Sequence, residues 1–121
     1  MHEKFLKSIL EQDRAPIVVC DLNSVIVYMN ASAKKEYHKD LTGSDLKKCH
    51  NDASNEKIDM VLSFFRESED NNIIFTYHSD EENKDVYMVA LRDDNRKLIG
   101  FYEKHEFRNR ETMNPYETVM K

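Results

Sequence analysis

Glycine, proline and cysteine occur only twice each among the 121 residues of this sequence, and tryptophan does not occur. Phosphate-binding loops need closely spaced glycines, so enzymes built on such a loop are excluded. A long apolar run is also missing, and acidic residues outnumber basic ones to give a formal net charge of −5. A membrane span needs about 18–20 apolar residues and duplex nucleic acid needs a dense cationic face. We therefore expect a single domain with neither membrane nor nucleic acid as a partner.

The two cysteines, Cys20 and Cys49, lie far apart in the sequence and form no Cys-x-x-Cys motif. The first residues, Met1-His2-Glu3-Lys4, do not show the basic and apolar regions of a signal peptide. Both observations predict a cytoplasmic protein with free thiols.

Motifs for catalysis and metal binding are also missing. His38, His50 and His78 do not have the short spacing of metal ligands, so surface histidines and no metal are expected. There is no Gly-x-Ser-x-Gly motif, and the neighbours Cys49 and His50 have no evident third residue to orient them. We expect no enzyme activity; a small enzyme that uses Cys49 and His50 is the alternative.

Hydrophobic periodicity divides the chain into helices and strands. Asn30 is placed to cap a helix, and Thr42 with Asp45 has the spacing of a capping box. Two strands before a helical block and three after it predict an α+β fold, a five-stranded antiparallel sheet with helices on one face. In chain order the expected elements are a helix at 3–12, strands at 17–20 and 25–29, short helices at 31–37 and 42–48, a long helix at 54–68, and strands at 73–78, 86–92 and 98–105.

This order of elements, with four local motifs, resembles the PAS family of sensory domains. Those motifs are the hairpin 17–30 that ends in Asn30, Leu41-Thr42-Gly43, the long helix around 58–65, and Leu98-Ile99-Gly100-Phe101. The family usually ends in Asp-Ile-Thr, where this chain has Glu106-Phe107-Arg108. The resemblance divides the chain into a flanking helix at 1–12, a PAS-like domain at 13–108 and a polar tail at 109–121.

PAS domains place ligands between the long helix and the sheet, so the resemblance implies a pocket for a small hydrophobic ligand. The alternative is that the same side chains fill a closed core. The pocket walls would come from Val19, Ile58, Leu62, Phe65, Phe75, Tyr87, Val89 and Phe101.

The pair Cys49-His50 before the long helix is similar to a bacterial PAS subgroup, although Asn51 stands where that subgroup has proline. Some PAS domains hold haem through a histidine near this helix, which makes His50 the candidate ligand and Cys49 a thiolate alternative. The Asn-Cys-Arg-Phe-Leu stretch of flavin-binding members is missing, so flavin is not expected. No cofactor is evident from the sequence itself.

The N-terminal helix carries an apolar stripe of Phe5, Leu6, Ile9 and Leu10. In PAS domains such a helix commonly packs on the outer sheet face of a partner, so the resemblance implies a homodimer. The alternative is that these residues cover the sheet of their own chain. The acidic run Asp80-Glu81-Glu82 is expected to be a solvated hairpin turn.

The expected function is a cytoplasmic, non-catalytic signalling module. It would bind a small molecule or a partner protein and signal through dimerisation or docking, with a separate effector or regulatory protein providing the output. Two alternatives stay open, a pure interaction domain with a filled core and a haem sensor that uses His50.

Overall fold

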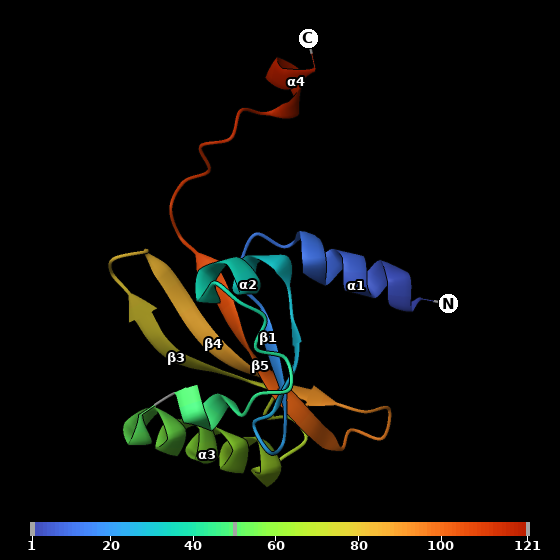
Figure 1. Ribbon diagram of the computed structural model, residues 1–121, viewed down its shortest axis with the longest axis vertical. Helices are drawn as coiled ribbons and strands as arrows, with labels where there is room; N and C mark the ends of the chain where they lie inside the picture. The colour runs from blue at the N-terminus through green and yellow to red at the C-terminus, as the bar shows by residue number, and fades with distance from the viewer. Residues whose placement is uncertain (1, 50, 121) are drawn as a thin grey trace.

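A five-stranded antiparallel sheet forms the centre of the computed structural model, which describes residues 2–49 and 51–120 (Figure 1). The strand order is β2-β1-β5-β4-β3, so the predicted α+β fold is confirmed. The elements are α1 (Glu3–Gln12), β1 (Val18–Asp21), β2 (Ile26–Met29), α2 (Ala31–Tyr37), the 3-10 turn η1 (Leu46–Cys49), α3 (Asp52–Glu67), β3 (Ile73–Ser79), β4 (Lys84–Arg92), β5 (Leu98–Phe107) and α4 (Tyr116–Val119).

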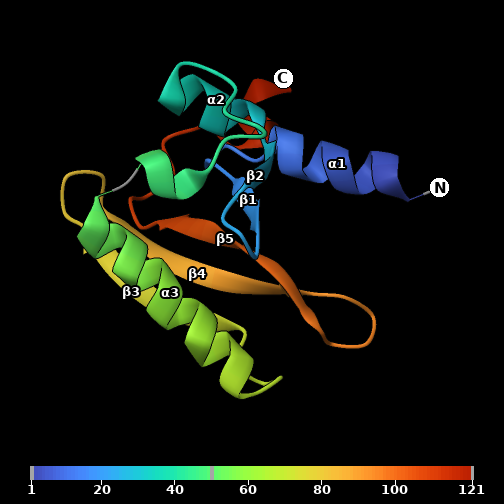
Figure 2. The same ribbon diagram turned by 60° about the horizontal axis from the view of Figure 1, so that its bottom comes forward.

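Helix α3 crosses β3 and β4 on one face of the sheet, here called the inner face (Figure 2). Its apolar stripe, which includes Ile58, Leu62 and Phe65, is buried against the sheet residues Met88 and Phe101. Burial of each such side chain stabilises the fold by about 1.5–3 kcal/mol. The helix begins earlier than expected, because the Asn51 side chain caps it by accepting from the Ser54 amide.

Asn30 joins four segments of the chain and is completely buried. Its side-chain oxygen accepts hydrogen bonds from the amides of Ile17 and Ala33, each at 2.9 Å. Its side-chain nitrogen donates to the carbonyls of Leu10 at 2.9 Å and Ala15 at 3.0 Å. The predicted cap of α2 is therefore confirmed, and the same residue also fixes the exit of α1.

The helix expected over 42–48 is reduced to the single turn η1. The predicted capping box is wrong, because the Thr42 amide and hydroxyl both donate to the Asp40 side chain, while Asp45 accepts from the Lys47 amide. Backbone pairing with β2 replaces the helix here: the Ile26 amide donates to the carbonyl of residue 44 at 2.9 Å.

Helix α1 projects from the sheet and buries none of its residues (Figure 1). Phe5, Leu6 and Ile9 are 71%, 60% and 67% exposed, so they do not cover the sheet of their own chain. The helix is nevertheless attached at its C-terminal end, where Glu11 accepts a hydrogen bond from the Tyr28 hydroxyl. Among the described residues, no helix has the length and apolar character needed to cross a membrane.

Candidate functional site

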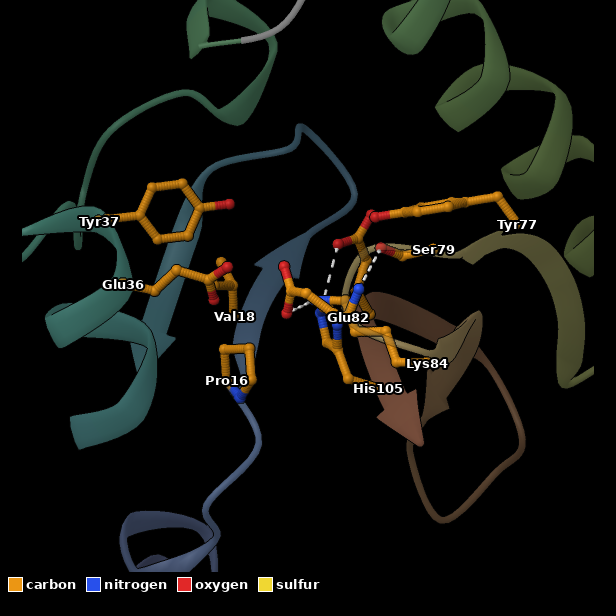
Figure 3. Close-up of a pocket in the computed structure, with 10 residues that line it drawn as sticks. Pro16, Val18, Glu36, Tyr37, Tyr77, Ser79, Glu82, Lys84 and His105 are labelled. Atoms are coloured by element: carbon orange, nitrogen blue, oxygen red, sulfur yellow. Dashed lines mark hydrogen bonds and ion pairs between the residues drawn. The ribbon is translucent and has the colours of Figure 1, made fainter. Parts of the chain in front are cut away.

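A cavity of about 170 Å³ lies on the inner face of the sheet, beside the C-terminal end of α2 (Figure 3). Glu36 and Tyr37 lie on one side of it, and Tyr77, Lys84 and His105 lie on the other. We call this hollow the inner-face cavity. Its lining residues are Pro16, Val18, Glu36, Tyr37, Tyr77, Ser79, Glu82, Lys84, Glu103 and His105.

Strand alternation explains why polar side chains gather there. Side chains at every second position share a face, so Phe101, Glu103 and His105 all point to the inner side of β5. On β4 the same face runs from Ala90 to Lys84. The inner face is therefore apolar under α3 and becomes charged toward the end where the tail leaves β5.

Lys84 is only 4% exposed, which is rare for a lysine. Its ammonium nitrogen lies 3.1 Å from a carboxylate oxygen of Glu82 and 5.6 Å from the centre of the Phe107 ring. A buried charge needs such a partner, since desolvation otherwise disfavours it strongly. The acidic run 80–82 is an exposed hairpin turn, as expected, and Glu82 within it makes this specific contact.

The His105 side chain is 10% exposed, and its Nε2 lies 3.8 Å from a carboxylate oxygen of Glu103. Burial, together with the charge of Lys84, lowers the pKa of His105 to about 4, so the ring is neutral at pH 7. The other ring nitrogen, Nδ1, is buried. That buried Nδ1 has no hydrogen-bond partner among the described residues, an arrangement that costs about 1–3 kcal/mol.

Tyr77 lies among charged side chains in the cavity. Burial raises the pKa of Tyr77, the carboxylates of Glu103, Glu82 and Glu36 raise it further, and the charge of Lys84 lowers it. The ammonium of Lys57 lies 5.1 Å from the centre of the Tyr77 ring, so the ring already attracts a cation at its face.

A second, more open hollow of about 410 Å³ adjoins the inner-face cavity and shares Tyr37, Tyr77 and Glu103 with it. It extends to Lys57 and Ile58 of α3. The two hollows are neighbours between α2, α3 and the sheet.

The eight residues of the predicted hydrophobic pocket do not lie together. Four are in the closed core beneath α3: Ile58, Leu62, Phe65 and Phe101. The other four are on the opposite, outer face of the sheet: Val19, Phe75, Tyr87 and Val89.

Register is the physical reason for this correction. Tyr87 and Val89 alternate with the inner-facing Met88, so they must point outward. Phe75 pairs with Tyr87 across the β3–β4 ladder, with ring centres 5.5 Å apart, and Val19 pairs with the outward Tyr102 of β5. The sequence did not reveal this because both faces of these strands carry apolar residues.

The remaining candidate residues are His50, the two cysteines and the possible metal ligands. His50, the candidate haem ligand, lies outside the described residues, and nothing is described of the Cys49 side chain. Burial raises the pKa of the Cys20 thiol to about 12, which makes it unreactive. Across residues 2–49 and 51–120, His, Cys, Asp and Glu form no cluster that could hold a metal ion.

Sequence reasoning missed the inner-face cavity. The sequence does contain one signal for it. Phe101, Glu103 and His105 stand at every second position of one strand, so two charged or polar side chains share a sheet face with a buried phenylalanine. The spacing alone did not show that Lys84 and Glu82 would meet them.

Comparison with known proteins identifies the fold. No family model matches the sequence, and no curated protein matches it either. Among solved structures, a C-terminal domain from Streptococcus mutans matches with a TM-score of 0.66 and 20% identity, over 86% of this chain and 83% of that one. A PAS domain from Colwellia psychrerythraea matches with a TM-score of 0.64 and 16% identity, over 87% and 95%.

The PAS domain of the histidine kinase ThkA is similar as well, with a TM-score of 0.54 and 17% identity, over 74% of this chain and 95% of that one. The chain therefore has the PAS fold, as the resemblance in its motifs implied.

Proposed function

We propose that this chain is a sensory signalling module that self-associates through α1 and binds a small molecule in the inner-face cavity. The observation that carries the proposal is the state of α1. Phe5, Leu6 and Ile9 are mostly exposed, yet the helix is attached to the core through Asn30 and Glu11. A helix held in place with an uncovered apolar stripe is typical of an interface.

The partner surface we propose is the outer sheet face of a second copy. Phe75 and Ile73 on that face are each more than half exposed. Tyr87 and Val89 lie beside them and are only partly buried. Each chain has an apolar stripe on α1 and an apolar outer sheet face. In a symmetric dimer, the stripe of each chain would pack on the sheet face of the other.

Response to a ligand would follow from differential binding. Asn30 bonds to α1, to the segment before β1 and to α2, and α2 supplies Glu36 and Tyr37 to the cavity. A ligand that prefers one position of α2 would bias the position of α1 and so the dimer. We propose that the output passes to a separate effector protein, without catalysis by this chain and in the cytoplasm. A similar solved structure shows the histidine kinase ThkA in complex with a response regulator.

A pure interaction domain is the second candidate, and one observation favours it. Leu62 and Phe65 are 3% and 0% exposed, so side chains occupy the space beneath α3 in which the sequence predicted a hydrophobic ligand. For this reason we propose the polar cavity as the ligand site of the sensor.

Sedimentation velocity over a range of protein concentrations tests the interface. We expect a dimer for the native chain and a monomer for Leu6→Asp and Ile9→Asp, because each places a charge in the apolar stripe. Lys7→Asp introduces the same residue away from the stripe and should leave the dimer intact. Monomeric native protein at every concentration, or dimeric stripe variants with native circular dichroism, would overturn the proposal.

A further inference from the structure

An apolar groove of about 500 Å³ lies between α3 and β3, at one edge of the sheet. We call it the α3–β3 groove. Met60 and Phe64 of α3 and Ile74 and Phe75 of β3 provide its apolar walls. Met60 is 73% exposed and Phe75 is 55% exposed. Large apolar side chains that gather at an exposed hollow mark a contact surface for another protein segment.

The β3 edge of the sheet also needs a covering segment. Sheet edges are commonly protected by charged residues, by proline or by a helix laid over them. β3 contains no proline and no acidic residue, lysine or arginine. The opposite edge strand, β2, is covered by its own chain, because the Ile26 amide donates to the Ser44 carbonyl at 2.9 Å and the Ile26 carbonyl accepts from the Gly43 amide at 2.7 Å. A helix along β3 would protect the second edge and fill the groove beside it.

Helix α1 has the shape that this groove requires. Phe5 and Ile9 are four residues apart and form one row along the helix, while Leu6 lies beside that row. All three are at least 60% exposed. A cavity of about 150 Å³ holds one benzene molecule, so the groove has room for the Phe5 ring and the Ile9 side chain. With this row in the groove, Leu6 would lie over Phe75 on the outer side of β3.

The charges at the groove favour the same helix. Lys4 and Leu6 flank Phe5 on opposite sides of α1, so Lys4 faces α3 when Leu6 faces β3. Glu56 of α3 is exposed at the groove. Lys57, the other charged residue there, has its ammonium 5.1 Å from the centre of an aromatic ring. Lys4 would therefore meet a carboxylate, which attracts it.

The helix in the groove cannot be α1 of the same chain. Asn30 and Tyr28 hold α1 beside β2, and β2 and β3 are opposite edges of the sheet. Figures 1 and 2 both show α1 projecting away from α3. A two-fold axis parallel to the strands, with the outer sheet faces together, places the β2 edge of each sheet over the β3 edge of the other. Each α1 then lies at the groove of its partner.

We propose that α1 of a second copy docks in the α3–β3 groove, with Phe5 and Ile9 buried in it and Lys4 paired with Glu56. The proposal rests on the proposed self-association through α1 and extends its surface from the outer sheet face around the β3 edge. Phe75 joins the two parts, because it belongs to the outer face and also lines the groove. Phe5 becomes the anchor of the dimer.

Photocrosslinking of the full chain locates the helix. Phe5→p-benzoylphenylalanine keeps an aromatic side chain that bonds covalently to a neighbouring C–H group on irradiation. We expect a crosslinked dimer on a denaturing gel, with the crosslinks found by mass spectrometry at Met60, Phe64 or Phe75. Lys7→p-benzoylphenylalanine, outside the apolar stripe, is the control and should give no crosslinked dimer.

A charge exchange tests the pairing of Lys4 with Glu56. Both side chains are exposed, so neither change disturbs folding. Lys4→Glu and Glu56→Lys should each weaken the dimer by about fivefold at low salt, because each brings two like charges together. The double variant restores opposite charges and should dimerise as the native chain does, as measured by sedimentation equilibrium.

Met60→Asp tests the groove itself. The variant places a charge in the groove wall and should weaken the dimer at least about tenfold. Ser63→Asp adds the same residue at an exposed position of α3 outside the groove and should leave the dimer unchanged. Circular dichroism checks that both variants are folded.

Crosslinks confined to β4 and β5 would overturn docking in the groove. The same conclusion would follow if Met60→Asp dimerised as well as Ser63→Asp while Leu6→Asp was monomeric; in both cases the interface through α1 survives. Absence of rescue in the double variant would overturn the pairing of Lys4 with Glu56. A native chain that is monomeric at every concentration would overturn the proposed self-association and docking in the groove together.

Discussion

The side-chain nitrogen of Asn30 donates a hydrogen bond to the carbonyl oxygen of Leu10, 2.9 Å away, and so joins the last turn of α1 to the core. The side-chain oxygen of Asn30 accepts hydrogen bonds from the backbone amides of Ile17 and Ala33. One buried amide therefore sets where the N-terminal helix leaves the domain.

Asn30→Ala should lower the free energy of unfolding by about 3–5 kcal/mol, because several buried backbone groups lose their partner at once. Urea unfolding measures the change. Asn51→Ala removes only a helix cap, of α3, and should cost about 1 kcal/mol. Equal losses for the two variants would show that the bonds to Leu10 and Ile17 contribute nothing.

Arg92→Lys should loosen the end of α3. The guanidinium donates to the carbonyls of Phe65, Ser68 and Asn71, and an ammonium cannot reproduce this planar set of donors. We expect a loss of about 1–3 kcal/mol and faster hydrogen exchange in the last turn of α3. Arg66→Lys, an exposed change on the same helix, is the control, and unchanged exchange in the Arg92 variant would contradict this assignment.

Gly100→Ala should destabilise the sheet more than Gly43→Ala. A methyl group at Gly100 would lie 2.2 Å from the carbonyl oxygen of Cys20 and push β1 from β5, at a cost of about 2–3 kcal/mol. Gly43 has a φ of +91° but no atom within 4 Å of the added carbon, so only backbone strain of about 1 kcal/mol applies. Thermal unfolding ranks the two, and the reverse order would be inconsistent with the close approach of β1 and β5.

Protonation of His105 should weaken the fold in mild acid. Its pKa falls from 6.5 to about 4 on folding, so the unfolded chain binds more protons between these values. Stability is therefore complete above pH 6.5 and declines as the pH falls toward 4, by roughly 3 kcal/mol at most. Glu82, Glu103 and Lys84 surround the ring and set its environment.

His105→Gln should flatten the pH dependence of unfolding between pH 6.5 and 4, whereas His2→Gln, at the exposed start of α1, should preserve it. Denaturant titrations at half-unit steps of pH give both profiles. An unchanged slope in the His105 variant would mean that other groups are responsible for the acid sensitivity.

The sequence predicted the elements well and the site poorly, for a physical reason. Ile58, Leu62 and Phe65 follow the helical repeat and lie on one buried face, so the sequence alone predicts α3 and its buried side. Strands with apolar residues on both faces do not reveal which face is inner, so Tyr87 and Val89 were assigned to the wrong side.

The cavity itself depends on contacts between distant positions. The register of β4 against β5 brings Val86 opposite His105 and thereby places Lys84 and Glu103 on one face. Bulges, such as the shift between Phe75 and Tyr77, alter the alternation in a way that composition does not show.

The neighbouring positions of β1 and β5 have a mechanical consequence. Val19 pairs with Tyr102 and Asp21 with Gly100, so the chain enters β1 at the same end of the sheet at which it leaves β5. Tension applied between the two ends of the domain would load the hydrogen bonds of this antiparallel pair one after another. The pair would open like a zipper at low force instead of resisting in shear, and β1 with its attached α1 would be the first part to peel away.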